Sequence, residues 1–318
     1  MPIEFVPRKS AVLSSSSLAC LNDVASINMT SSCVHRCVYC YSCGYSSRPS
    51  EGIVVVYSNL FEKLKKELPR KRKLPKTVYF CPSSDLFQPI PEILQTGYDI
   101  IEYLLFQSIN VAFVTKGIIP DRFFGLFQKN FERVQAQVGL ISTDKNVLSL
   151  FEPNAATPEV RLEQIRKLSD IGIKTTVRLD PIIPGVTDDD ETLQRVCESV
   201  AAAGVKNIAA SVLFLRPAIK ESMQRNISDE GIRKSIFDRF SRSKRLGIHA
   251  DRSSVTALPR EDRESIFIRL QNIAARYGLG LHVCGCKNPD IPPDTFSKTC
   301  RLSGSWNDSQ QKELFDLE

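Results

Sequence analysis

Short apolar runs rich in β-branched residues alternate with helix-like patterns over about two hundred residues of the chain. The runs predict six strands, at residues 25–29, 77–81, 111–116, 134–142, 174–183 and 207–215. One helix pattern between them has recognisable ends, with Thr157 typical of an N-cap, Pro158 of a first helical position and Gly172 of a stop. A second helix pattern covers residues 188–204. This alternation predicts an α/β fold with a parallel sheet, either doubly wound or curled into a full or partial barrel.

The pattern changes after residue 215. Two helix patterns, at 228–246 and 259–277, follow one another, and a strand-like run at 280–283 leads to three cysteines. We therefore divide the chain into a lead-in of residues 1–24, a core of residues 25–216 and a C-terminal extension of residues 217–318. In both kinds of sheet, ligands bind at the carboxyl ends of the strands, so we expect the chemistry on the loops there.

The chain has 318 residues, of which 42% are hydrophobic and 25% charged, and this composition excludes disorder as the main state. The net charge of +6 is local, since eight basic residues and one acid lie between Lys63 and Lys76. This basic patch suits either a nucleic-acid partner or a solvated helix end. No apolar run approaches the ~18 residues of a membrane span. We expect a cytoplasmic protein with no membrane partner and with reduced cysteines.

Three of the ten cysteines follow the first predicted strand, as Cys33, Cys37 and Cys40. Thiolates spaced C-x3-C-x2-C on a loop can converge on an iron–sulfur cube and leave its fourth iron open to an external ligand. Zinc is a competing interpretation, but no second cysteine pair follows at the usual finger spacing. A third interpretation is buried packing thiols, against which the close spacing in a polar loop argues.

With Tyr39 before the last cysteine, this motif resembles that of the radical S-adenosylmethionine superfamily, and more narrowly its spore photoproduct lyase-like branch. Further motifs that carry the resemblance follow in order, at 84–89, 113–116, 142, 151–153 with 161–162, and 180–185. The resemblance covers roughly residues 7–215. It implies a partial (β/α)6 barrel of TIM type with a C-terminal α-rich extension.

The resemblance also implies the chemistry. Cys33, Cys37 and Cys40 would hold a [4Fe-4S] cluster, and the amino and carboxylate groups of S-adenosylmethionine would chelate its fourth iron. One electron from a donor such as flavodoxin or ferredoxin would produce a 5′-deoxyadenosyl radical that abstracts hydrogen from the substrate. The enzyme would be a lyase or a radical-based modifying enzyme, with nucleic-acid repair or modification as the first expectation.

The cofactor-binding residues implied by the resemblance are Tyr39, Ser84, Asp85, Lys116, Ser142 and Arg178. Ser84 and Asp85 would contact the methionyl amine, and Lys116 would meet the carboxylate. These pairings are chemically complementary. Ser142 would reach the ribose, the backbone near Tyr39 would approach the adenine, and Arg178 is another candidate for the carboxylate.

Structural alternatives exist for several of these residues. Asp85 is equally suited to a helix N-cap and Ser142 to a turn, and Arg178 to a structural salt bridge. His35 would either face water or donate a hydrogen bond near the cluster. Glu152, before a proline, is interpreted as a loop residue without a chemical role.

A further implied catalytic residue is Cys81. The spore photoproduct lyase-like branch carries a cysteine just before its Ser-Asp pair, where the thiol donates hydrogen to the product radical. In this chain one more residue separates Cys81 from Ser84 and Asp85, which could turn the side chain to the opposite face of the strand. The alternative is a small, buried packing cysteine.

The extension carries Cys284 and Cys286 in a C-x-C pair, with Cys300 beyond a proline-rich loop. In a reducing compartment such a trio favours a metal site, so we predict a second [4Fe-4S] cluster or a zinc there. A fourth ligand could be Cys43, Cys20 or the substrate.

Two other functions fit the same residues. A radical enzyme could act on a small metabolite or a peptide bound near the auxiliary site. A non-catalytic iron–sulfur protein would use the cysteines structurally and would form no 5′-deoxyadenosine.

Overall fold

The computed structural model describes residues 2–15, 21, 24–45, 48–50, 52–248, 253–292 and 295–296. Within them the main sheet has eight strands in the order β13-β10-β9-β8-β7-β6-β3-β2. Six parallel strands match the predicted ones in order and place, namely β3 (Ala25–Ile27), β6 (Thr77–Phe80), β7 (Asn110–Thr115), β8 (Val134–Gly139), β9 (Lys174–Ile182) and β10 (Asn207–Val212). The predicted α/β class is therefore confirmed.

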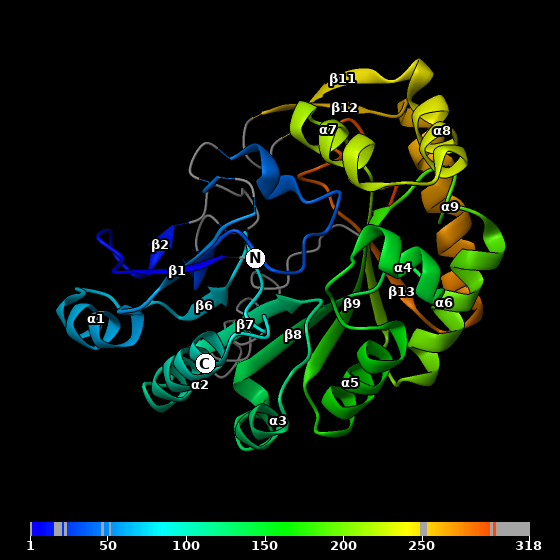
Figure 1. Ribbon diagram of the computed structural model, residues 1–318. Helices are drawn as coiled ribbons and strands as arrows, with labels where there is room; N and C mark the ends of the chain where they lie inside the picture. The colour runs from blue at the N-terminus through cyan, green and yellow to red at the C-terminus, as the bar shows by residue number, and fades with distance from the viewer. Residues whose placement is uncertain are drawn as a thin grey trace.

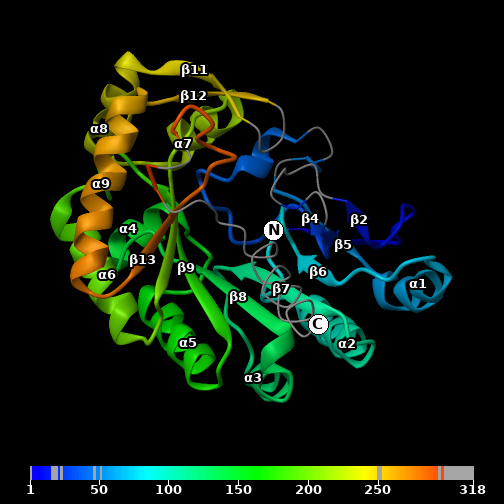
Figure 2. The same ribbon diagram turned by 180° about the vertical axis from the view of Figure 1, so that it is seen from behind.

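The sheet curves into an incomplete barrel with helices along its outer side (Figures 1 and 2). These helices are α2 (Pro91–Phe106), α3 (Asp121–Gln128), α5 (Pro158–Asp170), α6 (Asp190–Ala202) and α9 (Arg260–Arg276). A short helix, α4 (Lys145–Phe151), follows β8. The antiparallel β2 (Ser14–Ser15) and the parallel β13 (Gly280–Val283) occupy the two edges of the sheet.

The two faces of the sheet differ in polarity. On β8, Val134, Ala136 and Val138 belong to the main apolar core, while Gln135 and Gln137 alternate with them and point to the opposite face. The same alternation places Tyr79 of β6 on the inner side, where its hydroxyl donates to Gln137 Oε1 at 3.0 Å. The inner side of the sheet thus carries polar side chains beside apolar ones such as Ala112, whereas the outer side is apolar.

The ends of two helices follow the expected chemistry. The Thr157 hydroxyl accepts from the backbone N–H of Val160 at 3.5 Å, at the start of α5. Beyond the end of that helix, Gly172 has φ +80°, a conformation that favours glycine. The Asp189 carboxylate caps α6 and accepts from Thr192 N at 2.8 Å.

The extension departs from the prediction at residues 228–246. Helix α8 spans only Glu230–Arg239, and the chain then forms β11 (Lys244–Gly247), which pairs antiparallel with β12 (Ser254–Ala257). The reason is visible in the sequence, because no apolar residue follows at helical spacing between Phe240 and Leu246. Helix α7 (Pro217–Asn226) connects β10 to this region.

A separate three-stranded sheet stands beside the barrel. It has the order β1 (Ile3–Val6), β5 (Val54–Tyr57), β4 (Thr30–Ser31), and α1 (Leu60–Glu67) follows it at the outer edge of the molecule (Figure 1). The strand β13 pairs with β10, so the extension supplies an edge of the main sheet, and the domain boundary at residue 216 stays a prediction. In the described part of the chain, no helix is both long and apolar enough to cross a membrane.

Candidate active site

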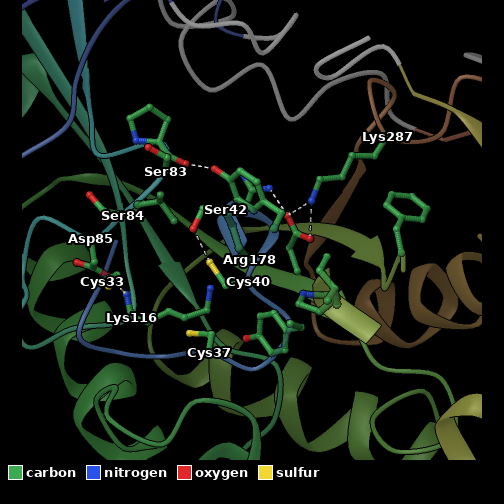
Figure 3. A pocket seen from close by; sticks show the side chains of 18 of the residues that line it. Cys33, Cys37, Cys40, Ser42, Ser83, Ser84, Asp85, Lys116, Arg178 and Lys287 are labelled. Atoms are coloured by element: carbon green, nitrogen blue, oxygen red, sulfur yellow. Dashed lines mark hydrogen bonds and ion pairs between the residues drawn. The ribbon is translucent and has the colours of Figure 1, made fainter. Parts of the chain in front are cut away.

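A cavity of about 270 Å³ opens at the carboxyl ends of the strands (Figure 3). Cys33, Cys37 and Cys40, from the loop after β4, line it together with Asp85, which follows β6, and Lys116, which follows β7. Residues from three widely separated parts of the sequence therefore meet at one place, as the sequence predicted.

The segment 33–40, here named the cysteine loop, is held by neighbours on two sides. The Val34 N–H donates to Gln88 Oε1 and the Val38 N–H donates to the Phe151 carbonyl, each at 2.9 Å. Arg36 within the loop and Ser32 directly before it have positive φ, at 52° and 73°, a costly backbone conformation that these contacts stabilise.

His35 is buried within the cysteine loop and does not face water. Its Nδ1 lies 3.0 Å from the Asn154 carbonyl, and its Nε2 lies 3.4 Å from the Asp85 carboxylate. Burial by itself lowers the pKa of His35, but the negative charge of Asp85 outweighs it and raises the pKa above its ordinary value. His35 thus connects the cysteine loop to the loop after β6.

The three thiols differ in their surroundings. Burial raises the pKa of Cys33 and of Cys37, whereas a hydrogen bond from the Cys43 thiol lowers the pKa of Cys40 to about 5. The Ser42 hydroxyl also lies 3.0 Å from Cys40 Sγ. Cys43 therefore accompanies Cys40, and its role as a fourth ligand of the extension's metal site stays a prediction.

The donor set fits an iron–sulfur cube better than a single metal ion. Among the described residues, no three or more His, Cys, Asp or Glu side chains are arranged to hold one ion. In a cube each cysteine binds a separate iron, so the three sulfurs need not converge on one point. Three thiols that line one cavity on a constrained loop meet that requirement.

Asp85 connects the loop after β6 to the end of β7 by hydrogen bonds. Its carboxylate accepts from Thr115 Oγ1 at 2.9 Å and from the backbone N–H groups of Phe87 and Lys116 at 2.8 Å. Burial raises its pKa, but His35 and these donors overcome the effect and keep the pKa below its ordinary value. Asp85 is not a helix N-cap, because α2 begins at Pro91 with Ile90 before it.

Ser84 and Lys116 present polar groups to the cavity. The Ser84 hydroxyl is buried and has no hydrogen-bond partner among the described residues. The Lys116 ammonium lies 5.7 Å from the centre of the Tyr39 ring, and no ion pair to it occurs within the described residues. Burial lowers the pKa of Lys116, yet Glu152 and Cys37 raise it above the usual value, so the group is cationic. The Lys116 ammonium could therefore pair with a carboxylate of a ligand, and the Ser84 hydroxyl could accept a hydrogen bond from an amine.

Gly139 shapes the position of Lys116. A Cβ at residue 139 would lie 3.0 Å from both Cε and Cγ of Lys116, closer than ordinary contact. Any other residue at position 139, the last of β8, would force the Lys116 side chain to move.

Ser142 and Cys81 do not line the cavity as described. Ser142 is buried and its hydroxyl accepts from the Asp144 N–H at 3.0 Å, which is the geometry of a turn. Cys81 is fully buried with φ +53°, and burial raises its pKa to about 12. The roles of Ser142 at the ribose and of Cys81 as hydrogen donor stay predictions.

Arg178 lines the cavity and also forms an ion pair. Its Nη2 lies 2.5 Å from Asp180, and Lys287, from the loop after β13, lies 2.8 Å from both oxygens of the same carboxylate (Figure 3). Burial raises the pKa of Asp180, but Lys287 and Arg178 lower it well below its ordinary value. The salt-bridge alternative for Arg178 is therefore present in the structure, together with its access to the cavity.

Cys284 and Cys286 line the same cavity as the cysteine loop. Cys300 and Cys20 lie outside the described residues. The extension thus brings two of its three predicted metal ligands to the site, and the metal itself stays a prediction.

Residues 27–197, which include the cysteine loop, match the family model described as the Radical SAM superfamily. The chain belongs to the radical SAM superfamily. Membership implies a [4Fe-4S] cluster and S-adenosylmethionine, and it identifies the protein as an enzyme. The cavity with Cys33, Cys37 and Cys40 is the place in this structure where the residues fit both groups.

The chain is also similar to curated proteins, one of which is named as a radical SAM enzyme. The chain is 28% identical over 211 residues to an uncharacterized protein of Acidianus two-tailed virus, covering 62% of this chain and 69% of that protein. It is 26% identical over 204 residues to an uncharacterized protein of Mycobacterium tuberculosis, covering 60% of this chain but only 58% of the relative. It is 23% identical over 215 residues to the radical SAM Nalpha-GlyT isomerase of Pseudomonas phage M6, covering 66% of this chain and 44% of the isomerase.

Among solved structures, the fold is similar to that of spore photoproduct lyase. A variant of that enzyme with bound AdoMet and dinucleoside spore photoproduct matches with a TM-score of 0.65 and 15% identity, over 88% of this chain and 81% of the other. The likeness confirms the fold predicted by the resemblance, including the incomplete barrel.

Sequence reasoning did not foresee the contacts of two buried residues that support the radical SAM site from behind Tyr39, Glu152 and Arg161. The Tyr39 hydroxyl donates to Glu152 Oε1, and the Arg161 guanidinium lies 2.5 Å from Oε2, with both charged side chains fully buried. Glu152 follows the end of α4 as a loop residue, as expected, and the absence of a chemical role stays a prediction; its structural role in a buried ion pair was not foreseen. A signal was present, since Arg161 lies one turn before Ile165 and so on the inward face of α5.

Proposed function

We propose that this radical SAM enzyme binds its cluster at Cys33, Cys37 and Cys40 and S-adenosylmethionine beside it, and that it abstracts hydrogen from a substrate held in the same cavity. A bound cluster supplies the electron that cleaves S-adenosylmethionine into methionine and a 5′-deoxyadenosyl radical. The observation that carries the proposal is the meeting of three thiols, the Lys116 ammonium and the Ser84 hydroxyl in one cavity.

Different residues would bind different parts of S-adenosylmethionine. Lys116 pairs with the carboxylate of the methionyl moiety, and Ser84 accepts a hydrogen bond from its amine. Tyr39 offers its ring and the adjacent backbone to the adenine. Asp85 contributes mainly by position, because its oxygens already accept from Thr115 and from two backbone N–H groups.

For the substrate we infer a nucleobase, in a nucleotide or a nucleic acid, which the enzyme repairs or modifies. Support comes from the similarity to spore photoproduct lyase, whose solved complex holds a dinucleoside spore photoproduct. The basic patch at Lys63–Lys76 would contact phosphates only of a long strand, since α1 lies at the outer edge of the molecule (Figure 1). If the basic patch contacts phosphates, the affinity for nucleic acid should fall steeply as the salt concentration rises. An affinity that does not change with salt would exclude this role of the patch.

The predicted auxiliary cluster, or a zinc, is a separate part of the proposal. Its support is that Cys284 and Cys286 line the cavity. The test is metal analysis of the triple variant Cys33→Ala, Cys37→Ala, Cys40→Ala. About four irons or one zinc per chain in this variant would support the auxiliary site, and the absence of both metals would overturn the prediction of that site.

The direct test of the activity is anaerobic. Protein reconstituted with iron and sulfide, then reduced with dithionite, is given S-adenosylmethionine, and 5′-deoxyadenosine is measured by chromatography. We expect it from the wild type and not from the triple cysteine variant. Wild-type protein that holds its cluster but forms no 5′-deoxyadenosine would leave only the non-catalytic alternative.

A further inference from the structure

Ser42, two residues after the last cysteine of the cysteine loop, directs its hydroxyl to a sulfur atom. The hydroxyl oxygen lies 3.0 Å from Cys40 Sγ (Figure 3), and Ser42 is buried. A thiolate that binds iron has no proton, so in the cluster-bound protein the hydroxyl donates and the sulfur accepts. Because this contact is shielded from water, its hydrogen bond is stronger than the same bond at the surface.

A second donor reaches the same sulfur. The Cys43 thiol donates a hydrogen bond to Cys40, and the Arg48 side chain donates one to Cys43 in turn. A thiol is a weaker donor than a hydroxyl, so Ser42 provides the stronger of the two contacts. Two side chains within three residues of Cys40 therefore donate to this one ligand of the expected cluster.

The turn that carries these donors is held in place by its neighbours. Residues Tyr41–Gly44 form a short 3-10 helix, η2, and the Tyr45 N–H donates to the Ser42 carbonyl at 3.1 Å. The Tyr41 hydroxyl donates to the Pro82 carbonyl, in the loop after β6, and the rings of Tyr41 and Tyr45 pack edge to face. The direction of the Ser42 side chain is thus fixed by the fold.

The other two cysteines of the loop have different surroundings. Among the described residues, no side-chain hydroxyl or thiol donates to Cys33 or Cys37. Cys33 accepts a hydrogen bond from the backbone N–H of His35. Side-chain donors are therefore concentrated on Cys40, which makes it the ligand through which the chain most strongly influences the cluster.

Hydrogen bonds to the sulfur ligands are among the factors that set the reduction potential of an iron–sulfur cluster. When the cluster takes one electron from a reductant, it gains one negative charge. A donor to a sulfur ligand stabilises this additional charge. Donors to Cys40 should therefore raise the reduction potential, so that the cluster accepts an electron from a milder reductant.

We propose that Ser42 and Cys43 are positioning residues of the cofactor, which raise the reduction potential of the cluster through their hydrogen bonds to the Cys40 sulfur. The inference deepens the proposed function and rests on it, since it requires a cluster held by Cys33, Cys37 and Cys40. The step it concerns is the transfer of one electron from a low-potential donor to the cluster, in which the donor is oxidised and no covalent bond changes.

The experiment measures the midpoint potential of the full chain, reconstituted anaerobically with iron and sulfide. Dithionite and redox mediators set the potential, and electron paramagnetic resonance counts the reduced cluster. A separate sample with S-adenosylmethionine identifies the signal of this cluster, because binding at its open iron changes that signal. In Ser42→Ala we expect the ratio of reduced to oxidised cluster at a given potential to fall about tenfold, which corresponds to a midpoint about 59 mV more negative.

Matched variants separate the hydrogen bond from packing. Ser42→Thr keeps the hydroxyl and should keep the wild-type potential, whereas Cys43→Ala should shift it in the same direction as Ser42→Ala but by less. The control is Ser83→Ala. Ser83 lines the same cavity, but its hydroxyl donates to Asn28 Oδ1 at 2.9 Å and not to a sulfur, so its loss should leave the potential unchanged.

Several results would overturn the inference. A wild-type potential in Ser42→Ala or in Cys43→Ala, with full iron content, removes that residue from the proposal. An equal shift in Ser83→Ala or in Ser42→Thr would attribute the effect to packing and not to the hydrogen bond. Loss of iron from Ser42→Ala would show that the residue holds the cluster in place and does not tune it.

The wild-type protein separates this inference from the proposed function. If it holds no cluster after reconstitution, the proposed function fails, and this inference fails with it. If it forms 5′-deoxyadenosine while Ser42→Ala has an unchanged potential, only the inference about Ser42 fails. If the potential shifts as expected but the wild type forms no 5′-deoxyadenosine, the hydrogen-bond inference is supported and the radical chemistry is contradicted.

Discussion

The Glu152 carboxylate lies 2.5 Å from the Arg161 guanidinium, and neither side chain has exposed surface. Arg161 also donates to the carbonyls of Ala156 and Gly139 at 2.8 Å, and Tyr39 donates to Glu152. The pair therefore joins the cysteine loop to the end of β8 and the start of α5.

Removing the carboxylate should destabilise the protein strongly. Glu152→Ala leaves a buried guanidinium without its counter-charge and the Tyr39 hydroxyl without its acceptor, so we expect a loss of about 3–5 kcal/mol in the free energy of unfolding. Urea denaturation of the protein measures it. Glu163→Ala is the control, because Glu163 pairs with Arg166 at the surface and its loss should cost no more than about 1 kcal/mol. Similar values for the two variants would refute the role of the buried pair.

Lys116 should control the affinity for S-adenosylmethionine. Lys116→Met keeps most of the side-chain length and removes the charge, so we expect the Kd to rise about tenfold or more with the iron content unchanged. Equilibrium dialysis on the reconstituted protein measures the Kd, and a colorimetric iron determination measures the iron content. Lys145→Met, at an exposed ion pair with Glu159, serves as the control. Unaltered affinity in Lys116→Met would remove this residue from the cofactor site.

Gly139→Ala should weaken cofactor binding through Lys116. The new Cβ would lie 3.0 Å from Lys116 Cε, so the lysine must move, and we expect a several-fold rise in the KM for S-adenosylmethionine in the 5′-deoxyadenosine assay. The comparison is Gly125→Ala in α3, where a Cβ meets nothing within 4 Å. That change should stabilise the helix by about 0.5–1 kcal/mol and leave the KM unchanged. Equal KM values for both variants would contradict the steric argument.

The cap of α6 should make stability depend on pH. Burial raises the pKa of Asp189, but the hydrogen bond from the Thr192 N–H outweighs it and lowers the pKa below its ordinary value. The carboxylate thus stabilises the fold above its unfolded-state pKa, and this contribution is lost as the pH falls through the folded-state value. Asp189→Ala should cost about 1 kcal/mol at neutral pH and less in acid, measured by urea denaturation at each pH. A cost independent of pH would mean that the charge does not contribute.

The sequence by itself determined the order of strands and helices and the cysteine motif. These features depend on short-range regularities, such as the apolar alternation of β8, the Thr157 cap and the spacing of Cys33, Cys37 and Cys40. Because parallel strands place their carboxyl ends on one side, the convergence of Asp85 and Lys116 with the cysteines also followed from sequence order.

Only the tertiary structure decided which charged groups are paired and which remain open to a ligand. Glu152 meets Tyr39 across 113 positions, and Lys287 meets Asp180 across 107. Spacing along the chain carries no information about such contacts, since they depend on how the extension and the loops fold over the strands. The same packing buries Cys81 and places Phe214 and Arg216 at the cavity. Burial and long-range charge pairing, which set each group's chemistry, are properties of the folded chain alone.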